Sequence, residues 1–267
     1  MKKPEIAWFS TGRDQAALDL FRAVLADIRT GNIALDISFV FSNREAGESL
    51  PSDQFQAFVR EKGLPLITFS SARFEPELRK DGLKKARAGK DELLKKWREA
   101  YDRELLDRIT PYPFNLIFLA GYMLVVGPAL CKTRRILNLH PAPPGGPKGS
   151  WQEVMEELIE TRAPYAGAQI HQVTPILDEG PPWTYFVFPV SGKIFEGLKG
   201  EELFNRLREE ELKREFPLIL ITLKLVGEEA LSFSPEGGPV TFQGKPMPGG
   251  LDISNEVEEF LFTGKLP

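Results

Sequence analysis

An asparagine and a histidine stand two residues apart in the segment RILNLHPAPPGG, residues 135–146. Side chains two apart in a strand point to the same face, so Asn138 and His140 share one patch while their apolar neighbours face the other side. An amide and an imidazole placed together can donate hydrogen bonds to a developing negative charge, and the imidazole can also transfer protons. The alternative is that both side chains only hydrogen-bond to the loop that follows them.

The second of the chain's two histidines precedes an acidic loop. His171 lies in the strand-like run QIHQV, and Asp178 follows it just before Gly180 and two prolines. A carboxylate held in a rigid loop can orient an imidazole and stabilise its protonated form. Spacing alone leaves open whether Asp178 meets His140.

Short apolar runs alternate with helical patterns over the first 140 residues. The strand-like runs cover 6–10, 33–42, 64–70, 116–122 and 135–140, and helical patterns cover 14–28, 52–63 and much of 74–109. This alternation predicts a doubly wound α/β fold, in which a mostly parallel sheet carries helices on both faces. Ligands of such sheets bind beyond the carboxyl ends of the strands, so the polar residues there are candidate site residues.

After residue 150 the pattern predicts a helix, two strands and a long helix over 201–225. Ser150 and Glu153 have the spacing of a capping box, which fixes where the first of these helices begins. The tail is rich in Gly and Pro, and its segment SFSPEGGPVTF predicts a β-hairpin before a short terminal helix. We therefore expect a catalytic domain over 1–230 and a C-terminal tail, 231–267, packed on the core.

The composition limits the function classes. The chain has 267 residues, of which 42% are apolar and 27% charged, as is typical of a soluble globular protein. A net charge of -4 argues against non-specific nucleic-acid binding, and no apolar run approaches the roughly 18 residues that span a membrane. The N-terminal apolar run is too short for a signal peptide, and the single Cys131 excludes an internal disulfide. A cytoplasmic protein is expected.

Several motifs in register resemble the folate-dependent formyltransferases, most closely the branch that acts on glycinamide ribonucleotide. They are FSTGRDQAALDLFRAV, FVFSNREAG, NLIFLAGYMLVVGP, NLHP and GAQIHQVTPILDEGP, and they keep their order and approximate spacing from residue 5 to about residue 225. The resemblance implies a Rossmann-like formyltransferase fold. It also implies transfer of a formyl group from 10-formyltetrahydrofolate, as co-substrate, to a primary amine, with no metal.

The same resemblance assigns roles to positions of this chain. The implied catalytic residues are Asn138, His140 and Asp178. The implied cofactor-binding residues, which would line the pterin pocket, are Met123, Leu124, Val125, Val126 and Leu177. The implied substrate-binding residues are Gly12, Arg13, Asp14 and Glu211. The segment GYMLVVGP also fits a second interpretation, a buried strand end, because Leu and Val carry no polar signature.

Some positions depart from the family pattern, and they bear on which amine accepts the formyl group. Asp14 would repel a phosphate unless it caps the helix that follows. Leu212 stands where the family usually carries a ribose-binding Glu, although Glu211 is adjacent. The loop APPGGPKGSWQEV also differs, and the helical material around 75–100 and the tail beyond 230 are additional.

Glycinamide ribonucleotide in purine biosynthesis is the expected acceptor. The alternatives are another amine, such as an amino sugar nucleotide, or a catalytically silent relative that binds folate or a nucleotide. A dinucleotide dehydrogenase is disfavoured, because no Gly-x-Gly-x-x-Gly follows the first strand. The expected partners are small molecules, with a homodimer as an open alternative to a single chain, and no nucleic acid or membrane is expected.

Overall fold

The structure is a computed structural model that describes residues 3–233 and 238–267. The chain divides into two compact units. The first comprises Met1–Leu25, Asp36–Leu137 and Val173–Pro175, and the second comprises Ala26–Leu35, Asn138–Gln172 and Ile176–Pro267.

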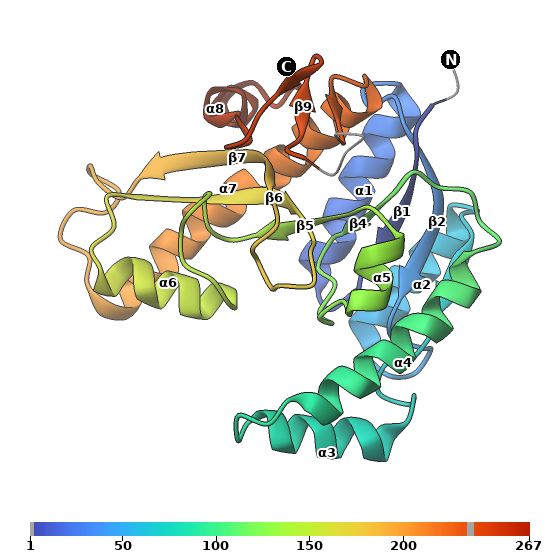
Figure 1. The fold of residues 1–267 in the computed structure, drawn as a ribbon. Helices are drawn as coiled ribbons and strands as arrows, with labels where there is room; N and C mark the ends of the chain where they lie inside the picture. The colour runs from blue at the N-terminus through green and yellow to red at the C-terminus, as the bar shows by residue number, and fades with distance from the viewer. Residues whose placement is uncertain (1–2, 234–237) are drawn as a thin grey trace. The chain divides into compact units, whose positions relative to one another are not determined.

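The first unit contains four strands that pair in parallel in the order β4-β1-β2-β3 (Figure 1). The strands are β1 (Glu5–Phe9), β2 (Asp36–Ser42), β3 (Leu66–Thr68) and β4 (Leu116–Leu119). The helices between and after them are α1 (Gln15–Thr30), α2 (Leu50–Glu61), α3 (Pro76–Ala86), α4 (Glu92–Ile109) and α5 (Pro128–Thr133). The last turns of α1 belong to the second unit, and β5 (Ile136–His140) likewise passes from the first unit into the second.

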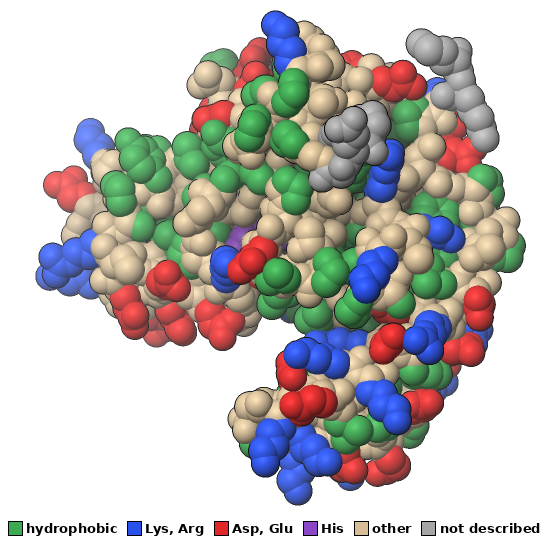
Figure 2. Space-filling view, viewed as in Figure 1, with side chains coloured by type: hydrophobic (Ala, Val, Ile, Leu, Met, Phe, Trp, Pro, Cys, Tyr) green, Lys and Arg blue, Asp and Glu red, His purple; other side chains and the backbone are tan. Residues whose placement is uncertain are grey.

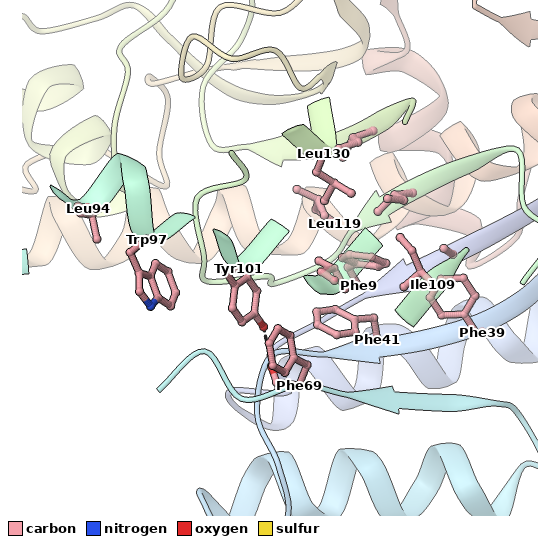
Figure 3. Close-up of a cluster of buried hydrophobic side chains, with 14 residues drawn as sticks. Phe9, Phe39, Phe41, Phe69, Leu94, Trp97, Tyr101, Ile109, Leu119 and Leu130 are labelled. Carbon is pink, nitrogen blue, oxygen red and sulfur yellow. Dashed lines mark hydrogen bonds between the residues drawn. The ribbon is translucent and has the colours of Figure 1, made fainter. Parts of the chain in front are cut away.

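Successive side chains of β1 point to opposite faces, and a different set of helices covers each face. Phe9 joins a buried cluster with Trp97 and Tyr101 of α4, shown in Figure 3. Trp8 instead packs against Phe21 of α1, with ring centroids 5.4 Å apart. Two-sided burial of a parallel sheet explains the continuous apolar runs of the sequence and confirms the predicted doubly wound α/β class.

The second unit is built around the antiparallel pair β6 (Tyr165–Gln172) and β7 (Pro182–Pro189), with β11 (Leu251–Asp252) added in parallel to β7. The helices are α6 (Trp151–Glu160), α7 (Gly200–Gly227) and α8 (Ser254–Thr263), and α7 packs on both β6 and β7. Gly167 allows the close approach of the two long strands, because a Cβ there would lie 2.0 Å from the Phe186 carbonyl oxygen.

The tail forms a small antiparallel sheet of β8 (Leu231–Ser232), β9 (Thr241–Phe242) and β10 (Lys245–Pro246). The pairing of β8 with β9 confirms the hairpin predicted at SFSPEGGPVTF, of which residues 234–237 lie outside the described residues. Within the same unit, α8 packs against β7 and α7. The proposed division at residue 230 stays a prediction.

Several element boundaries differ from the sequence prediction. The strand expected over 116–122 ends at Leu119, because Gly121 adopts a left-handed φ of 65° that extended backbone does not permit. The charged region 74–109 forms two helices, and Figure 2 shows Lys and Arg side chains gathered over this part of the surface. In the part of the chain that the structure describes, no helix is both long and apolar enough to cross a membrane.

Asp102 is a buried carboxylate on α4, only 3% exposed, at the beginning of α5. Its Oδ2 accepts a hydrogen bond from the Leu130 backbone amide at 3.4 Å. A Cβ on Gly127 would come within 2.6 Å of the same oxygen, so the carboxylate requires glycine there. Burial raises the pKa of Asp102 to about 6, although the backbone amides of Leu130 and Gly127 and the charge of Arg98 oppose the shift.

This raised pKa predicts a pH-dependent stability. The unfolded carboxyl ionises near pH 3.8, whereas the folded one stays protonated until about pH 6. The contribution of Asp102 is therefore complete below pH 3.8 and lost as the pH rises through 6, at a cost of about 3 kcal/mol. We expect Asp102→Asn to become more stable relative to wild type between pH 4 and pH 7, as measured by urea unfolding at both values. A constant difference between the two proteins would contradict this.

Candidate active site

Asn138 and His140 end β5, and the loop after β6 brings Asp178 to them within the second unit. One carboxylate oxygen of Asp178 lies 3.6 Å from His140 Nδ1, and both side chains are more than nine-tenths buried. Asp178 itself has a φ of 54°, a left-handed conformation that Asp adopts more readily than most residues. The structure thus brings together the three residues whose meeting spacing alone left open.

The second ring nitrogen of His140 contacts the loop that follows β5. His140 Nε2 lies 2.8 Å from the carbonyl oxygen of Pro147. A carbonyl oxygen only accepts, so this nitrogen must carry a hydrogen and donate it. Nδ1 faces the Asp178 carboxylate at 3.6 Å, which is longer than a hydrogen bond. Because both histidines are buried, Figure 2 shows only a small area of histidine at the surface of this view.

His171 on β6 is a third polar neighbour of the same group. Its Nε2 lies 3.4 Å from Asn138 Nδ2 and 3.8 Å from Asp178 Oδ1, and its Nδ1 lies 3.1 Å from the backbone oxygen of Gln172. Since the Gln172 oxygen requires a hydrogen on Nδ1, the neutral ring leaves Nε2 to accept from the Asn138 amide. That contact fixes the Asn138 amide nitrogen on the side of His171. The nitrogen carries a second hydrogen, which can be donated to another acceptor.

Burial lowers the pKa of His171 to about 4, and the nearby His140 adds to the shift while Asp178 opposes it. His171 is therefore neutral at physiological pH, as its acceptor role requires. The sequence prediction left His171 out of the site. The signal that could have found it is its place on a strand that leads directly into the Asp178 loop, in a chain with only one other histidine.

A depressed histidine pKa makes a stability prediction of the opposite sign to that of Asp102. The unfolded imidazole binds a proton below pH 6.5, but folded His171 does so only near pH 4. The stability is therefore present above pH 6.5 and falls by about 3 kcal/mol as the pH drops to 4. We expect His171→Gln to lose less unfolding free energy than wild type between pH 7 and pH 4.5. The ring proton signal of His171 should titrate near pH 4; a midpoint above 6 would refute the assignment.

The predicted phosphate loop begins α1 in the first unit. The Asp14 side chain accepts the Ala17 backbone amide at 3.1 Å, so Asp14 caps the helix. Gly12 has a φ of 59°, and a Cβ there would press against Phe55 at 2.9 Å. The half-exposed Arg13 forms an ion pair with Asp14 at 3.2 Å. An anion at this helix end would meet backbone amides and the Arg13 guanidinium, but also the half-exposed Asp14 carboxylate, whose second oxygen pairs with Arg13.

The segment Met123–Val126 follows β4 outside the strand, also in the first unit. Leu124 and Val126 pack against the buried cluster of this unit, whereas Met123 and Val125 are 56% and 40% exposed. The Met123 backbone amide donates to Thr11 Oγ1 at 2.8 Å, which ties this segment to the end of β1. The segment is therefore not a buried strand end. In the second unit, Leu177 is likewise exposed, at 57%.

Glu211 lies on α7 and is fully buried. Its Oε2 is 2.5 Å from Arg208, which also contacts Glu215 at 2.6 Å and lies over the Trp151 ring. Burial raises the pKa of Glu211, and the charge of Glu215 adds to this, while Arg208 opposes it. Among the described residues Glu211 Oε1 has no hydrogen-bond partner, so an acceptor atom remains. Leu212, by contrast, is 39% exposed.

Comparison with known protein families matches residues 14–218 to the family described as formyl transferase. The matched range covers most of the chain and includes the Asn138, His140 and Asp178 cluster. The chain belongs to the formyl transferase family.

Individual relatives of this formyl transferase carry a more specific name. The chain is 30% identical over 125 residues to the phosphoribosylglycinamide formyltransferase of Escherichia coli (strain K12), covering 46% of the chain and 56% of the relative. It is 33% identical over 92 residues to the enzyme of the same name from Schizosaccharomyces pombe, covering 32% and 44%. The match thus spans about half the length of these curated relatives.

Solved structures extend the similarity in fold. The phosphoribosylglycinamide formyltransferase of Coxiella burnetii superposes with a TM-score of 0.66 at 19% identity, covering 94% of this formyl transferase and 99% of the other chain. At this identity the similarity concerns the fold.

Proposed function

We propose that this formyl transferase moves a formyl group from 10-formyltetrahydrofolate to the primary amine of glycinamide ribonucleotide. The observation that carries the proposal is the buried cluster in which Asp178 lies 3.6 Å from His140, with Asn138 two residues away on the same strand. Membership of the family and the names of the curated relatives support the same reaction.

The reaction makes two demands that these side chains can meet. The amine nitrogen forms a bond to the formyl carbon, so negative charge grows on the formyl oxygen, and N–H groups of Asn138 and His140 can stabilise it. The bond from that carbon to the folate nitrogen then breaks. One proton passes from the amine to the departing nitrogen, and Asp178 can carry it directly or through water.

The substrate roles follow from the exposed and unpaired groups. We assign the acceptor's phosphate to the N-terminus of α1, where Gly12, Arg13 and the capping Asp14 lie. Glu211 is assigned to a ribose hydroxyl through Oε1, which has no partner among the described residues, and this assignment requires the fully buried side chain to become accessible when the acceptor binds. The exposed apolar side chains of Met123, Val125 and Leu177 are assigned to the pterin. A cytoplasmic location and a homodimer complete the proposal.

A panel of acceptors tests the proposal. The protein is incubated with 10-formyltetrahydrofolate and glycinamide ribonucleotide, an amino sugar nucleotide or no amine, and tetrahydrofolate release is followed. Turnover with glycinamide ribonucleotide alone is the expected result. Turnover only with another amine would reassign the acceptor, and formate release without any amine would indicate hydrolysis. No turnover in any arm would mean a silent family member.

A further inference from the structure

The loop after β5 returns to the site through three successive residues, 147–149, here called the return segment. The Pro147 carbonyl oxygen accepts from His140 Nε2 at 2.8 Å. Lys148 Nζ lies 2.6 Å from Glu179 Oε1, and the Gly149 amide lies 3.4 Å from Asp178 Oδ2. Each residue of the return segment therefore contacts either His140 or the Asp178–Glu179 pair, and all of these residues belong to the second unit.

These contacts involve both ring nitrogens of His140. The imidazole has two nitrogens, of which Nε2 donates to Pro147 and Nδ1 faces Asp178. The Nε2 hydrogen is therefore engaged by Pro147, while Nδ1 lies 3.6 Å from the Asp178 carboxylate, beyond hydrogen-bond distance. Either the Pro147 oxygen or the Asp178 carboxylate must move before a ring N–H of His140 can meet a substrate oxygen.

Pro147 is the acceptor that can leave at lower cost. The buried Asp178 carboxyl faces both His140 and His171, so withdrawing it would remove the shared polar neighbour of two buried imidazoles. The Pro147 oxygen is neutral and belongs to an irregular loop. The Pro147 oxygen is the carbonyl oxygen of an amide. The formyl group of 10-formyltetrahydrofolate is bonded to nitrogen and is therefore an amide carbonyl too.

We propose that the Pro147 carbonyl occupies, on His140 Nε2, the position that the formyl oxygen of the donor takes, and that the return segment must withdraw for productive donor binding. The inference rests on the proposed function. The Pro147 carbonyl thus satisfies His140 Nε2 from within the chain, and the donor exchanges one amide carbonyl for another.

Two features determine how firmly the return segment is held. Lys148 and Glu179 are 57% and 44% exposed, so their ion pair contributes a weak and salt-sensitive hold. Gly149 has a φ of 110°, and a Cβ there would lie 2.6 Å from Glu153 Oε2, which caps α6. The backbone conformation is thus fixed at the start of α6, and the ion pair is the part that a surface substitution can weaken without disturbing the fold.

Lys148→Met tests this arrangement in steady-state kinetics. A weaker hold raises the population of the open state, so the KM for 10-formyltetrahydrofolate should fall by about 2- to 5-fold while kcat is unchanged. The difference from wild type should shrink at high salt. The double exchange Lys148→Glu with Glu179→Lys restores a pair of opposite charges and should return KM to the wild-type value.

Arg206→Met is the matched control, because it removes an exposed ion pair of the same unit, to Glu209 at 2.9 Å. It should leave KM unchanged. A KM that is unchanged or raised in Lys148→Met would overturn the inference.

Histidine nitrogen spectra give a readout that needs no turnover. With only two histidines in the chain, His171→Gln assigns both rings. In the ligand-free protein, Lys148→Met should weaken the hydrogen bond reported by His140 Nε2 and leave the His171 signals unchanged. This spectral change without turnover on any amine would refute the proposed function, and with it the exchange with the donor, while the contact of the return segment with His140 would stand. Normal turnover with neither the spectral change nor the KM change would refute the inference alone.

Discussion

Replacing His140 with alanine should lower turnover by about 10²- to 10⁴-fold, the range expected when a positioned proton donor is removed. The ring contacts both Asp178 and the Pro147 carbonyl. In the proposed reaction, its loss removes a hydrogen-bond donor to the formyl oxygen. The measurement is single-turnover formyl transfer from 10-formyltetrahydrofolate to glycinamide ribonucleotide.

Two comparisons make this prediction specific to chemistry. Binding of tetrahydrofolate, which has no formyl oxygen, and the circular dichroism spectrum of His140→Ala should remain near wild type. His140→Gln should recover part of the rate, since its amide can donate to an oxygen but cannot carry a positive charge. Near-normal turnover of His140→Ala would exclude His140 from the reaction.

Asp178→Asn should also lower turnover by about 10²- to 10⁴-fold, for a different reason. Asn has the shape of Asp and tolerates the left-handed φ of 54° at this position, so the backbone is expected to stay in place. The substitution removes the negative charge that faces both histidines and the base that can carry the proton of the amine. The single-turnover rate on the same two substrates is the measurement.

Glu156→Gln is a suitable comparison for Asp178→Asn, because it removes an exposed carboxylate from α6 of the same unit. It should keep the wild-type rate. If Asp178→Asn retained that rate too, the carboxylate would have a purely structural role, and proton transfer would have to be assigned elsewhere.

The sheet of the first unit could be predicted from sequence because its burial pattern is local. The neighbours Trp8 and Phe9 are both buried, yet they face different helices, and only a two-sided parallel sheet gives a strand such an unbroken apolar run. The helix starts were predictable for a similar reason. Ser150 with Glu153 and the capping role of Asp14 depend on residues within one turn of each other.

Element ends were less predictable, because backbone conformation there depends on single residues. Leu-Ile-Phe-Leu-Ala-Gly-Tyr has strand character throughout, but the left-handed Gly121 ends β4 early. Similarly, the charged segment 74–109 is helical by composition. Its division into α3 and α4 falls at 87–91, where Gly89 has a left-handed φ of 77°. The two helices then pack so closely that a Cβ on Gly82 would lie 3.0 Å from the Leu94 backbone, a contact that no local pattern records.

Sequence reasoning named three residues that the structure brings together, but it gave only some of their contacts, and their catalytic roles stay predictions. Spacing placed Asn138 and His140 on one face, and the family resemblance supplied Asp178 as their partner. The neutral state of His171 depends on burial, which spacing does not give. The contact of Pro147 with His140 joins a strand end to an irregular loop. Hydrophobic periodicity predicts helices and strands, but it does not predict the contacts of such a loop.

The contacts of residues 147–149 also bear on how this loop can vary. Three consecutive residues each meet a fixed partner, so an added or deleted residue between Pro141 and Gly146 would misalign all three contacts at once. Substitutions within 141–146 that preserve the count change none of the partners directly. In proteins that keep these three contacts, we therefore expect the length of the segment 141–146 to be conserved more strictly than its amino-acid composition.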